Sequence, residues 1–323
     1  MKEMFPFEEW DRSILVKRNA VAQEGIPPED RPTEVILNYG IINVDKPSGP
    51  TSHMVSAYVK QILGIEKCGH SGTLDPKVTG VLPVALGRAS RIVQALLPAG
   101  KEYVALMHIH KDVPKTKIKA VMQEFVGEIK QLPPVKSAVK RRERKRTVYY
   151  LNIIEIDGRD VLFRVGCQAG TYVRKLCYDI GQRLGVGAHM QELRRTRVAN
   201  FDESTAFTLH DIRDAFYYYK KGNHKFIRKV IQPVERAVEH LPKVWALDSA
   251  VLSMSHGRDL AVPGVAKLEA CVKKGALVAV MTLKNELVGL GYAQMTPEEV
   301  MDSSTGIVVN LHKVFIHHAR VKI

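Results

Sequence analysis

The stretch Gly69-His70-Ser71-Gly72-Thr73-Leu74-Asp75-Pro76-Lys77-Val78-Thr79-Gly80-Val81-Leu82 combines three glycines with a single Asp-Pro step. Glycine reaches left-handed backbone angles that other residues avoid, and Pro76 restricts Asp75 to extended conformations. We therefore expect an irregular loop of fixed path that presents the Asp75 carboxylate in one direction. Local physics also allows a purely structural interpretation, in which Asp75 caps a helix, Pro76 opens it and Gly80 ends a turn.

The composition indicates a basic, globular protein. The chain has 323 residues, long enough for two domains, and its 48 Lys and Arg exceed 34 Asp and Glu to give a net charge of +14. Such a field attracts polyanions, so nucleic acid is the expected partner and an acidic membrane surface the competing one. No apolar run approaches the length of a membrane-spanning helix and no secretory signal is recognised, so we expect a cytoplasmic protein, or a nuclear one in a eukaryote.

The four cysteines, Cys68, Cys167, Cys177 and Cys271, are scattered along the chain. No two of them have the spacing of a zinc site or a redox pair. We therefore expect reduced thiols, with neither a disulfide framework nor a metal site.

The stretch around Asp75 resembles the catalytic loop of the TruB family of pseudouridine synthases. The form it takes is that of the dyskerin branch, the catalytic subunit of box H/ACA ribonucleoproteins. The family's Lys-Pro-x-Gly-x-Thr-Ser motif is similar to residues 46–52, its Lys-x-Tyr motif to residues 101–103, and a third motif to residues 187–198. This resemblance implies that Asp75 is the catalytic carboxylate.

The same resemblance implies roles for the other predicted catalytic residues. Tyr103 stacks on the target uracil and Leu193 packs on the flipped base, although either could be plain core. Arg174 opens a helix predicted from Thr171 to Gly185, where the helix dipole disfavours a cation and invites a carboxylate, and the family supplies Asp75. Such a guanidinium lowers the pKa of the carboxyl group and fixes its direction, unless Arg174 simply points to solvent. Tyr103 or Tyr172 assists the final proton transfer at C5.

Basic residues outside the catalytic set are candidates for RNA contacts. Lys46 is either a phosphate contact or a solvated turn residue, and Thr51 or Ser52 is either a helix cap or an RNA contact. The run from Ala138 to Thr147 is the densest charge cluster. It is expected to be a solvated, mobile loop when unbound, or a flexible basic clamp that orders on phosphates and resembles the family's thumb loop in position. The predicted RNA-binding residues are Lys46, His70, Arg141, Arg142, Arg144, Lys145, Arg146, Arg194, His256 and Arg258.

The chain is predicted to have three parts within an α+β fold class. Residues 1–34 form an N-terminal arm, which the resemblance implies packs on the C-terminal domain. Residues 35–240 form a catalytic domain with a mixed, mostly antiparallel sheet. Residues 241–323 contain short β-runs separated by Gly and Pro, which predict a small β-barrel. The segment Ser255–Gly264 is similar to the signature of the PUA domain, an RNA-binding barrel.

Converting uridine to pseudouridine breaks the C1′–N1 bond, rotates the uracil and joins C5 to C1′. It involves no redox change and no net hydrolysis, so no cofactor is required. Only one carboxylate is indicated, whereas a hydrolytic glycosidase typically uses two. Asp75 either attacks C1′ or removes the C2′ proton, and the sequence does not separate these.

Two other classes of function remain open at this stage. One is an RNA-binding scaffold without chemistry, and the other is a base-excising N-glycosylase that also flips its target nucleotide. Within the family, the basic run, the arm and the Asp75 stretch favour a guide-dependent catalytic subunit over a stand-alone enzyme of the tRNA T-loop. That implies box H/ACA guide RNA, substrate rRNA or tRNA and small accessory proteins as partners, without a membrane. Because no long Lys-rich tail follows Ile323, we expect an archaeal member.

Overall fold

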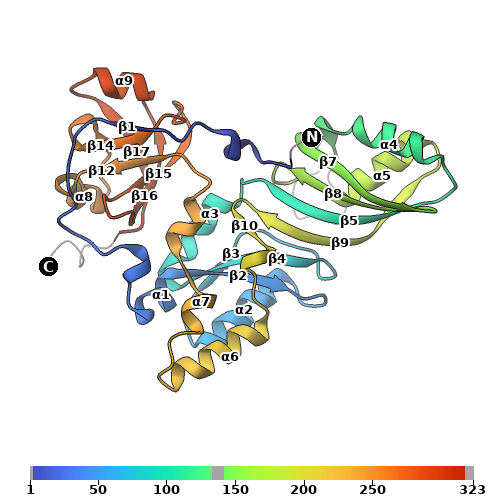
Figure 1. The fold of residues 1–323 in the computed structure, drawn as a ribbon, viewed down its shortest axis with the longest axis horizontal. Coiled ribbons are helices and arrows are strands. Elements are labelled where there is room, and N and C mark those ends of the chain that lie inside the picture. The colour runs from blue at the N-terminus through green and yellow to red at the C-terminus, as the bar shows by residue number, and fades with distance from the viewer. Residues whose placement is uncertain (1–2, 133–141, 317–323) are drawn as a thin grey trace. The chain divides into compact units, whose positions relative to one another are not determined.

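The computed structural model describes residues 3–132 and 142–316, which divide into two compact units (Figure 1). The first unit contains the described residues up to Glu8 together with Ile42–Val230. The second contains Glu9–Ile41 and the described residues from Ile231 onward. Each unit is therefore built from more than one stretch of the chain.

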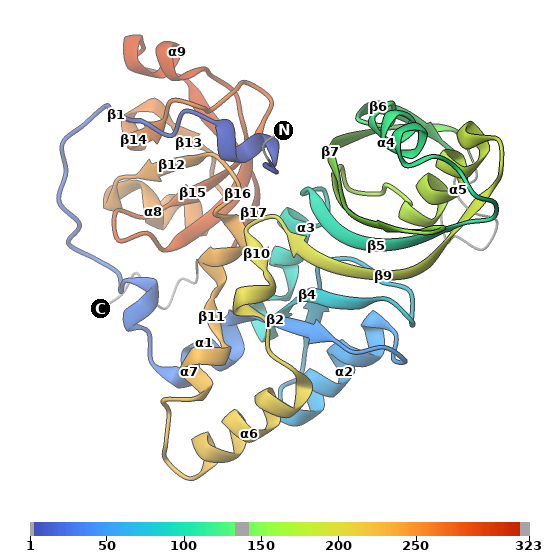
Figure 2. The same ribbon diagram turned by 45° about the vertical axis from the view of Figure 1, so that its right-hand side comes forward.

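The first unit is built on a long mixed sheet. The strands Thr79–Leu86 and Ala188–Val198 pair in parallel. From Ala188–Val198 to the far edge of the sheet, the neighbouring strands pair antiparallel. The strands curl strongly, as Figure 2 shows. In spatial order they are β2 (Gly40–Lys46), β4 (Thr79–Leu86), β9 (Ala188–Val198), β5 (Lys101–Ile109), β8 (Asp160–Cys167), β7 (Arg144–Asp157) and β6 (Gly127–Gln131), with the short β3 (Cys68–His70) on β4 and β10 (Phe201–Asp202) on β9.

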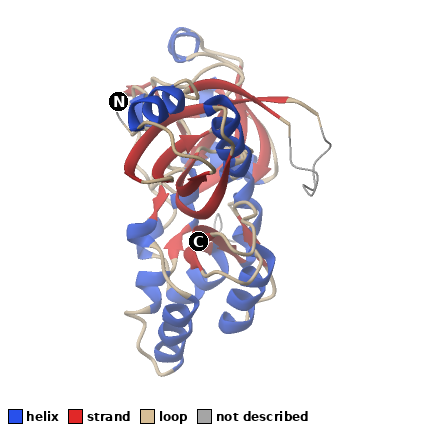
Figure 3. Cartoon of the chain, turned by 90° about the vertical axis from the view of Figure 1, so that its right-hand side faces the viewer, coloured by secondary structure: helices blue, strands red, loops and turns tan. Residues whose placement is uncertain are grey.

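Two helices fill the concave side of this curl, α4 (Lys115–Gln123) and α5 (Val173–Leu184). The α5 sequence places Val173, Leu176, Ile180 and Leu184 at helical spacing, and all are buried against the strands. Gly185 ends the helix with a φ of 79°, as predicted. The other helices of the first unit are α2 (Ser52–Leu63), α3 (Val93–Leu96), α6 (Leu209–Lys220) and α7 (Ile227–Val230), shown in blue in Figure 3.

The second unit contains a separate sheet of seven strands. It has its own core, which includes Val244, Leu268 and Val280. In spatial order its strands are β1 (Ile14–Val16), β14 (Val265–Glu269), β12 (Lys243–Ala246), β15 (Leu277–Met281), β16 (Leu287–Ala293), β17 (Ile307–Val314) and β13 (Leu260–Ala261), accompanied by α1 (Thr33–Tyr39), β11 (Gln232–Pro233), α8 (Asp248–Ser255) and α9 (Pro297–Asp302). The predicted α+β class is confirmed.

The N-terminal residues differ in part from the single arm predicted for residues 1–34. From Glu9 onward they belong to the second unit, where β1 pairs with β14 and Arg31 forms a bidentate ion pair with Glu235 at 2.7 and 2.8 Å. Residues 3–8 belong to the first unit instead. The physical reason is that Phe5 is completely buried there and the Glu8 carboxylate pairs with Arg197 at 2.7 Å.

The basic run also differs from its prediction. The solvated loop predicted to reach Thr147 is wrong for Arg144–Thr147, because β7 begins at Arg144. These residues pair with Glu128–Gln131 of β6, and Lys145 forms an ion pair with Glu128 at 2.8 Å. Arg142 is exposed before the strand, and Arg141 lies outside the described residues.

Candidate active site

The Asp75 loop connects β3 to β4 without an intervening helix. A tight turn follows Asp75, closed by a hydrogen bond of 3.0 Å from the Val78 N–H to the Asp75 carbonyl oxygen. The alternative in which Asp75 caps a helix is therefore wrong. Within this turn, Pro76 keeps Asp75 out of the helical conformation.

Residues of the 46–52 motif hold this loop in place from beneath. Lys46 is completely buried, and its Nζ donates to the carbonyl oxygens of Pro47, Pro76 and Val78 at 2.8–2.9 Å. Neither role predicted for Lys46 is correct, because these three acceptors take all of its N–H donors and leave none for a phosphate. Ser52 accepts a hydrogen bond of 2.8 Å from the Leu74 N–H, next to Asp75.

The helix-cap alternative applies to the neighbouring residue of that motif. Thr51 is the N-cap of α2, where its hydroxyl oxygen accepts a hydrogen bond of 3.1 Å from the Met54 N–H. This satisfies one of the free N–H groups of the first helical turn.

Gly80 brings the loop against β9. In the parallel pair of β4 and β9, Gly80 lies opposite Arg195 with a φ of +102°. A Cβ atom on Gly80 would lie only 2.1 Å from the carbonyl oxygen of Arg195. Only glycine fits this position, so its identity sets how close Asp75 comes to the side chains of β9.

The predicted ion pair is present. Arg174, in the first turn of α5, donates from Nη2 to Oδ2 of Asp75. About half of each side chain is exposed. The pair therefore fixes the direction of the carboxylate while leaving it accessible to a ligand.

A pocket of about 490 Å³ lies beside the ion pair. All five residues predicted to be catalytic line it, namely Asp75, Tyr103, Tyr172, Arg174 and Leu193. An adjoining cavity of about 1000 Å³ shares Asp75, Arg174 and Leu193 and adds Lys77 and Arg194. The first volume falls within the range of pockets that hold a small ligand.

The pocket also contains two buried cations that the sequence reasoning missed. Lys101 donates from Nζ to the carbonyl oxygens of Leu96, Leu97 and Ala99 at 2.7–2.9 Å, and burial, with the nearby Arg195 charge, lowers its pKa to about 7. The Arg195 guanidinium donates from Nε to the Val81 carbonyl oxygen at 2.7 Å and hydrogen-bonds the Tyr103 side chain.

A sequence signal for both cations was available. Residues two apart in a strand share a face, so Lys101 accompanies Tyr103 and Arg195 accompanies Leu193. Burial raises the pKa of Tyr103, which keeps its phenol protonated at neutral pH.

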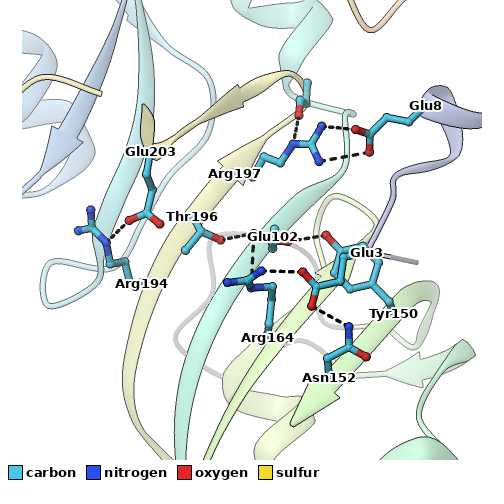
Figure 4. Close-up of polar contacts among 11 residues, drawn as sticks. Glu3, Glu8, Glu102, Tyr150, Asn152, Arg164, Arg194, Thr196, Arg197 and Glu203 are labelled. Carbon is cyan, nitrogen blue, oxygen red and sulfur yellow. Dashed lines mark hydrogen bonds and ion pairs between the residues drawn. The ribbon is translucent and has the colours of Figure 1, made fainter. Parts of the chain in front are cut away.

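Glu102, between Lys101 and Tyr103, points to the opposite face of β5. It accepts hydrogen bonds from Tyr150 at 2.6 Å and Thr196 at 2.7 Å (Figure 4). The N-terminal residues lie on this face as well, since Glu3 pairs with Arg164 at 2.6 Å. This network is therefore structural, and separate from the pocket.

The predicted RNA-binding residues are spread over both units. Arg194 lines the larger cavity and forms ion pairs with Asp45 at 3.0 Å and Glu203 at 2.6 Å. His70 is half-buried on β3, and burial lowers its pKa. His256 and Arg258 are exposed just after α8 in the second unit.

Neither a metal-binding cluster nor a membrane-spanning helix is present among the described residues. No group of three or more His, Cys, Asp or Glu side chains that could hold a metal ion was found in that part of the chain. None of the helices within residues 3–132 and 142–316 is both long and apolar enough to cross a bilayer.

Sequence comparison identifies the class of protein that this site defines. The family model described as "TruB family pseudouridylate synthase (N terminal domain)" matches residues 60–173, and "tRNA pseudouridylate synthase B C-terminal domain" matches residues 174–239. The chain therefore belongs to the TruB family of pseudouridylate synthases, as predicted. A PUA domain model matches residues 242–315 and a DKCLD (NUC011) domain model residues 7–56.

Close relatives cover almost the whole chain. The "Probable tRNA pseudouridine synthase B" of Thermococcus kodakarensis is 64% identical over 94% of this chain and 92% of its own length. The structure titled "Crystal Structure of a Cbf5-Nop10-Gar1 Complex" matches with a TM-score of 0.94 at 58% identity, over 98% of this chain and 97% of that one. "Structure of H/ACA RNP bound to a substrate RNA containing 2'-deoxyuridine" matches with a TM-score of 0.91 at 56% identity, over 98% of both chains.

Proposed function

We propose that the chain is an RNA pseudouridine synthase that isomerises uridine in rRNA, as the catalytic subunit of an archaeal H/ACA ribonucleoprotein, and also in the tRNA T-loop. The observation that carries this proposal is the Asp75–Arg174 pair at the mouth of a pocket lined by Tyr103 and Leu193. The relatives named above support it, because one bears the name of a tRNA pseudouridine synthase, one belongs to a Cbf5-Nop10-Gar1 complex and one to an H/ACA RNP bound to a substrate RNA.

The five pocket residues predicted to be catalytic each have a role in the reaction. Arg174 directs the Asp75 carboxylate toward the sugar, where it attacks C1′ or removes the C2′ proton. Tyr103 stacks on the flipped base and Leu193 packs against it, which offsets the cost of unstacking. Tyr103 or Tyr172 assists the final proton transfer at C5, and both line the pocket.

Bound RNA completes the site. The Asp75 and Arg174 side chains are half exposed in the chain alone, so the substrate itself covers the carboxylate and excludes water. The cations of the basic run, which are exposed at Arg142 and Lys145 and half-buried at Arg144 and Arg146, bind its phosphates. They are Arg142, Arg144, Lys145 and Arg146, with Arg141 outside the described residues.

The remaining domains bind the other components. Residues 241–323 form the PUA domain, in which the exposed His256 and Arg258 contact the guide RNA, and residues 35–240 form the catalytic domain. The arm from Glu9 to residue 34 stabilises the PUA domain through the pairing of β1 with β14. Small accessory proteins dock on the catalytic domain, and the assembly works in the cytoplasm.

The test is the substitution Asp75→Asn in the full chain, assembled with guide RNA and accessory proteins. Carbodiimide labelling of the target uridine measures pseudouridine formation on matched guide-dependent and tRNA substrates. We expect RNA affinity to be nearly unchanged and product formation to be lost. Asp160→Asn is the matched control, because Asp160 is an acid of the same unit that lines neither cavity and pairs with His108.

The alternatives give different outcomes in the same assay. A parent protein that binds RNA without forming pseudouridine would be a scaffold. Release of free uracil would indicate an N-glycosylase. Turnover by Asp75→Asn comparable to that of the parent would remove Asp75 from its role.

A further inference from the structure

Three cations lie buried beneath the pocket, and one of them is incompletely satisfied. Lys46 and Lys101 each donate to three carbonyl oxygens. Arg195, which is 1% exposed, donates from Nε to Val81 and hydrogen-bonds Tyr103, but its Nη2 has no partner among the described residues. Arg195 is therefore the one of the three with a donor left unused.

The charge of Arg195 is also uncompensated. No carboxylate in the described part of the chain lies within ion-pair distance of it, whereas Arg174 is paired with Asp75. Burial lowers the pKa of Arg195, and burial together with the Arg195 charge lowers the pKa of Lys46 and of Lys101. A buried cation without a counter-ion is costly to the fold, so the positive field beneath the pocket suits a negative charge that arrives there.

The geometry directs this charge toward the pocket. Arg195 lines the 490 Å³ pocket together with Asp75 and Tyr103. On β9 it shares a face with Leu193, which also lines the pocket, because side chains two residues apart in a strand point the same way. A base held between Tyr103 and Leu193 therefore lies beside the Arg195 guanidinium.

We propose that Arg195 is a catalytic residue whose guanidinium donates a hydrogen bond to a carbonyl oxygen of the target base and stabilises the uracil anion. This role rests on the proposed function. When the C1′–N1 bond breaks, its electron pair stays on N1 and the negative charge spreads to the carbonyl oxygens O2 and O4. The base then gives an electron pair from C5 to C1′, which either displaces the Asp75 carboxylate or is matched by return of the C2′ proton from Asp75. The C5 proton passes to Tyr103 or Tyr172, and N1 takes up a proton from water. Arg195 remains protonated throughout and acts only while the base is an anion.

The role predicts a dependence on the leaving group that a structural brace would not show. The full chain, assembled with guide RNA and accessory proteins, is given RNA carrying uridine or 5-fluorouridine at the target. Consumption of the target nucleoside is measured in a single turnover. Fluorine stabilises the base anion, so 5-fluorouridine needs less help from a cation.

Arg195→Met is expected to slow uridine consumption by about 100-fold, the typical effect of removing one charge-stabilising donor. The consumption of 5-fluorouridine should slow by a factor that is several-fold smaller. Arg195→Gln keeps an N–H donor for Val81 but loses the charge, so it should show the same pattern if Arg195→Met does not fold. Arg197→Lys is the control, because Arg197 is on the same strand but bonds Glu8 and the Ala199 carbonyl oxygen and lines neither cavity.

Equal losses on the two substrates, in a folded variant, would overturn the role of Arg195 and leave it a structural brace. A parent protein that consumes neither nucleoside would overturn the proposed function and this role with it. An active parent with equal losses would overturn this role alone. A leaving-group dependence in Arg197→Lys as large as that in Arg195→Gln would also refute it, because the effect would not be specific to the pocket.

Discussion

Replacing Gly80 by alanine should lower both stability and activity, because the substitution separates β4 from β9. The new Cβ would lie 2.1 Å from the Arg195 carbonyl oxygen, whereas real Cβ contacts essentially never fall below 3.0 Å. The strands must therefore move apart by roughly 1 Å, at an overpacking cost of about 1–3 kcal/mol. The φ of +102° adds about 1–3 kcal/mol of backbone strain.

Gly127→Ala separates these two contributions. Gly127 has a φ of +104°, and a Cβ there would meet nothing within 4 Å. Its substitution should cost only the strain of about 1–3 kcal/mol, measured by chemical denaturation beside Gly80→Ala. Because a displacement of roughly 1 Å in a catalytic site can cost about 100-fold in rate, Gly80→Ala should also slow pseudouridine formation while Gly127→Ala should not. Equal losses of stability in the two variants would refute this reasoning.

Three further substitutions test other buried or charged groups. Burial lowers the pKa of Lys101 from 10.5 to about 7. Between pH 7 and 10.5 the unfolded chain therefore binds more protons than the folded one, so the free energy of unfolding should rise with pH, by up to about 1.4 kcal/mol per pH unit. Lys101→Met should lack this component when denaturation at pH 7 and 9 is compared, and an unchanged slope would contradict the assignment. Glu235→Gln should destabilise the second unit by about 3 kcal/mol, because it removes the charge that pairs with the buried Arg31 and leaves Glu286 at 3.6 Å. A loss of less than about 1 kcal/mol in chemical denaturation would contradict this prediction. Joint neutralisation of the basic run should weaken RNA binding and flatten its dependence on salt, and an unchanged salt slope in a titration would exclude phosphate contacts there; the residues are Arg141, Arg142, Arg144, Lys145 and Arg146.

Much of the local structure was predictable because it depends on residues close in the sequence. The apolar spacing of α5 and its end at Gly185 are local signals, and so is the cap at Thr51. The Asp75–Arg174 pair was expected because the family resemblance supplied the distant partner. Side-chain spacing alone does not bring these two residues together.

The buried cations were harder to predict because their partners come from elsewhere in the chain. Lys46 looks like a turn residue until Pro76 and Val78 supply carbonyl acceptors some thirty positions later. Arg195 was overlooked beside Arg194, although strand alternation separates the two arginines onto opposite faces. The start of β7 at Arg144 was missed because its pairing with β6 outweighs the tendency of a charge run to remain a loop.

The first unit is assembled from two separate pieces of the chain. Phe5 is buried in the first unit and Glu8 pairs with Arg197 there, yet the next residues, Glu9–Ile41, belong to the second unit. A gene fragment encoding residues 42–230 would thus lack Glu3 and Glu8, the partners of Arg164 and Arg197, and would expose the apolar surface on which Phe5 packs. Neither unit is one continuous segment, so no single uninterrupted stretch of the gene encodes either of them whole.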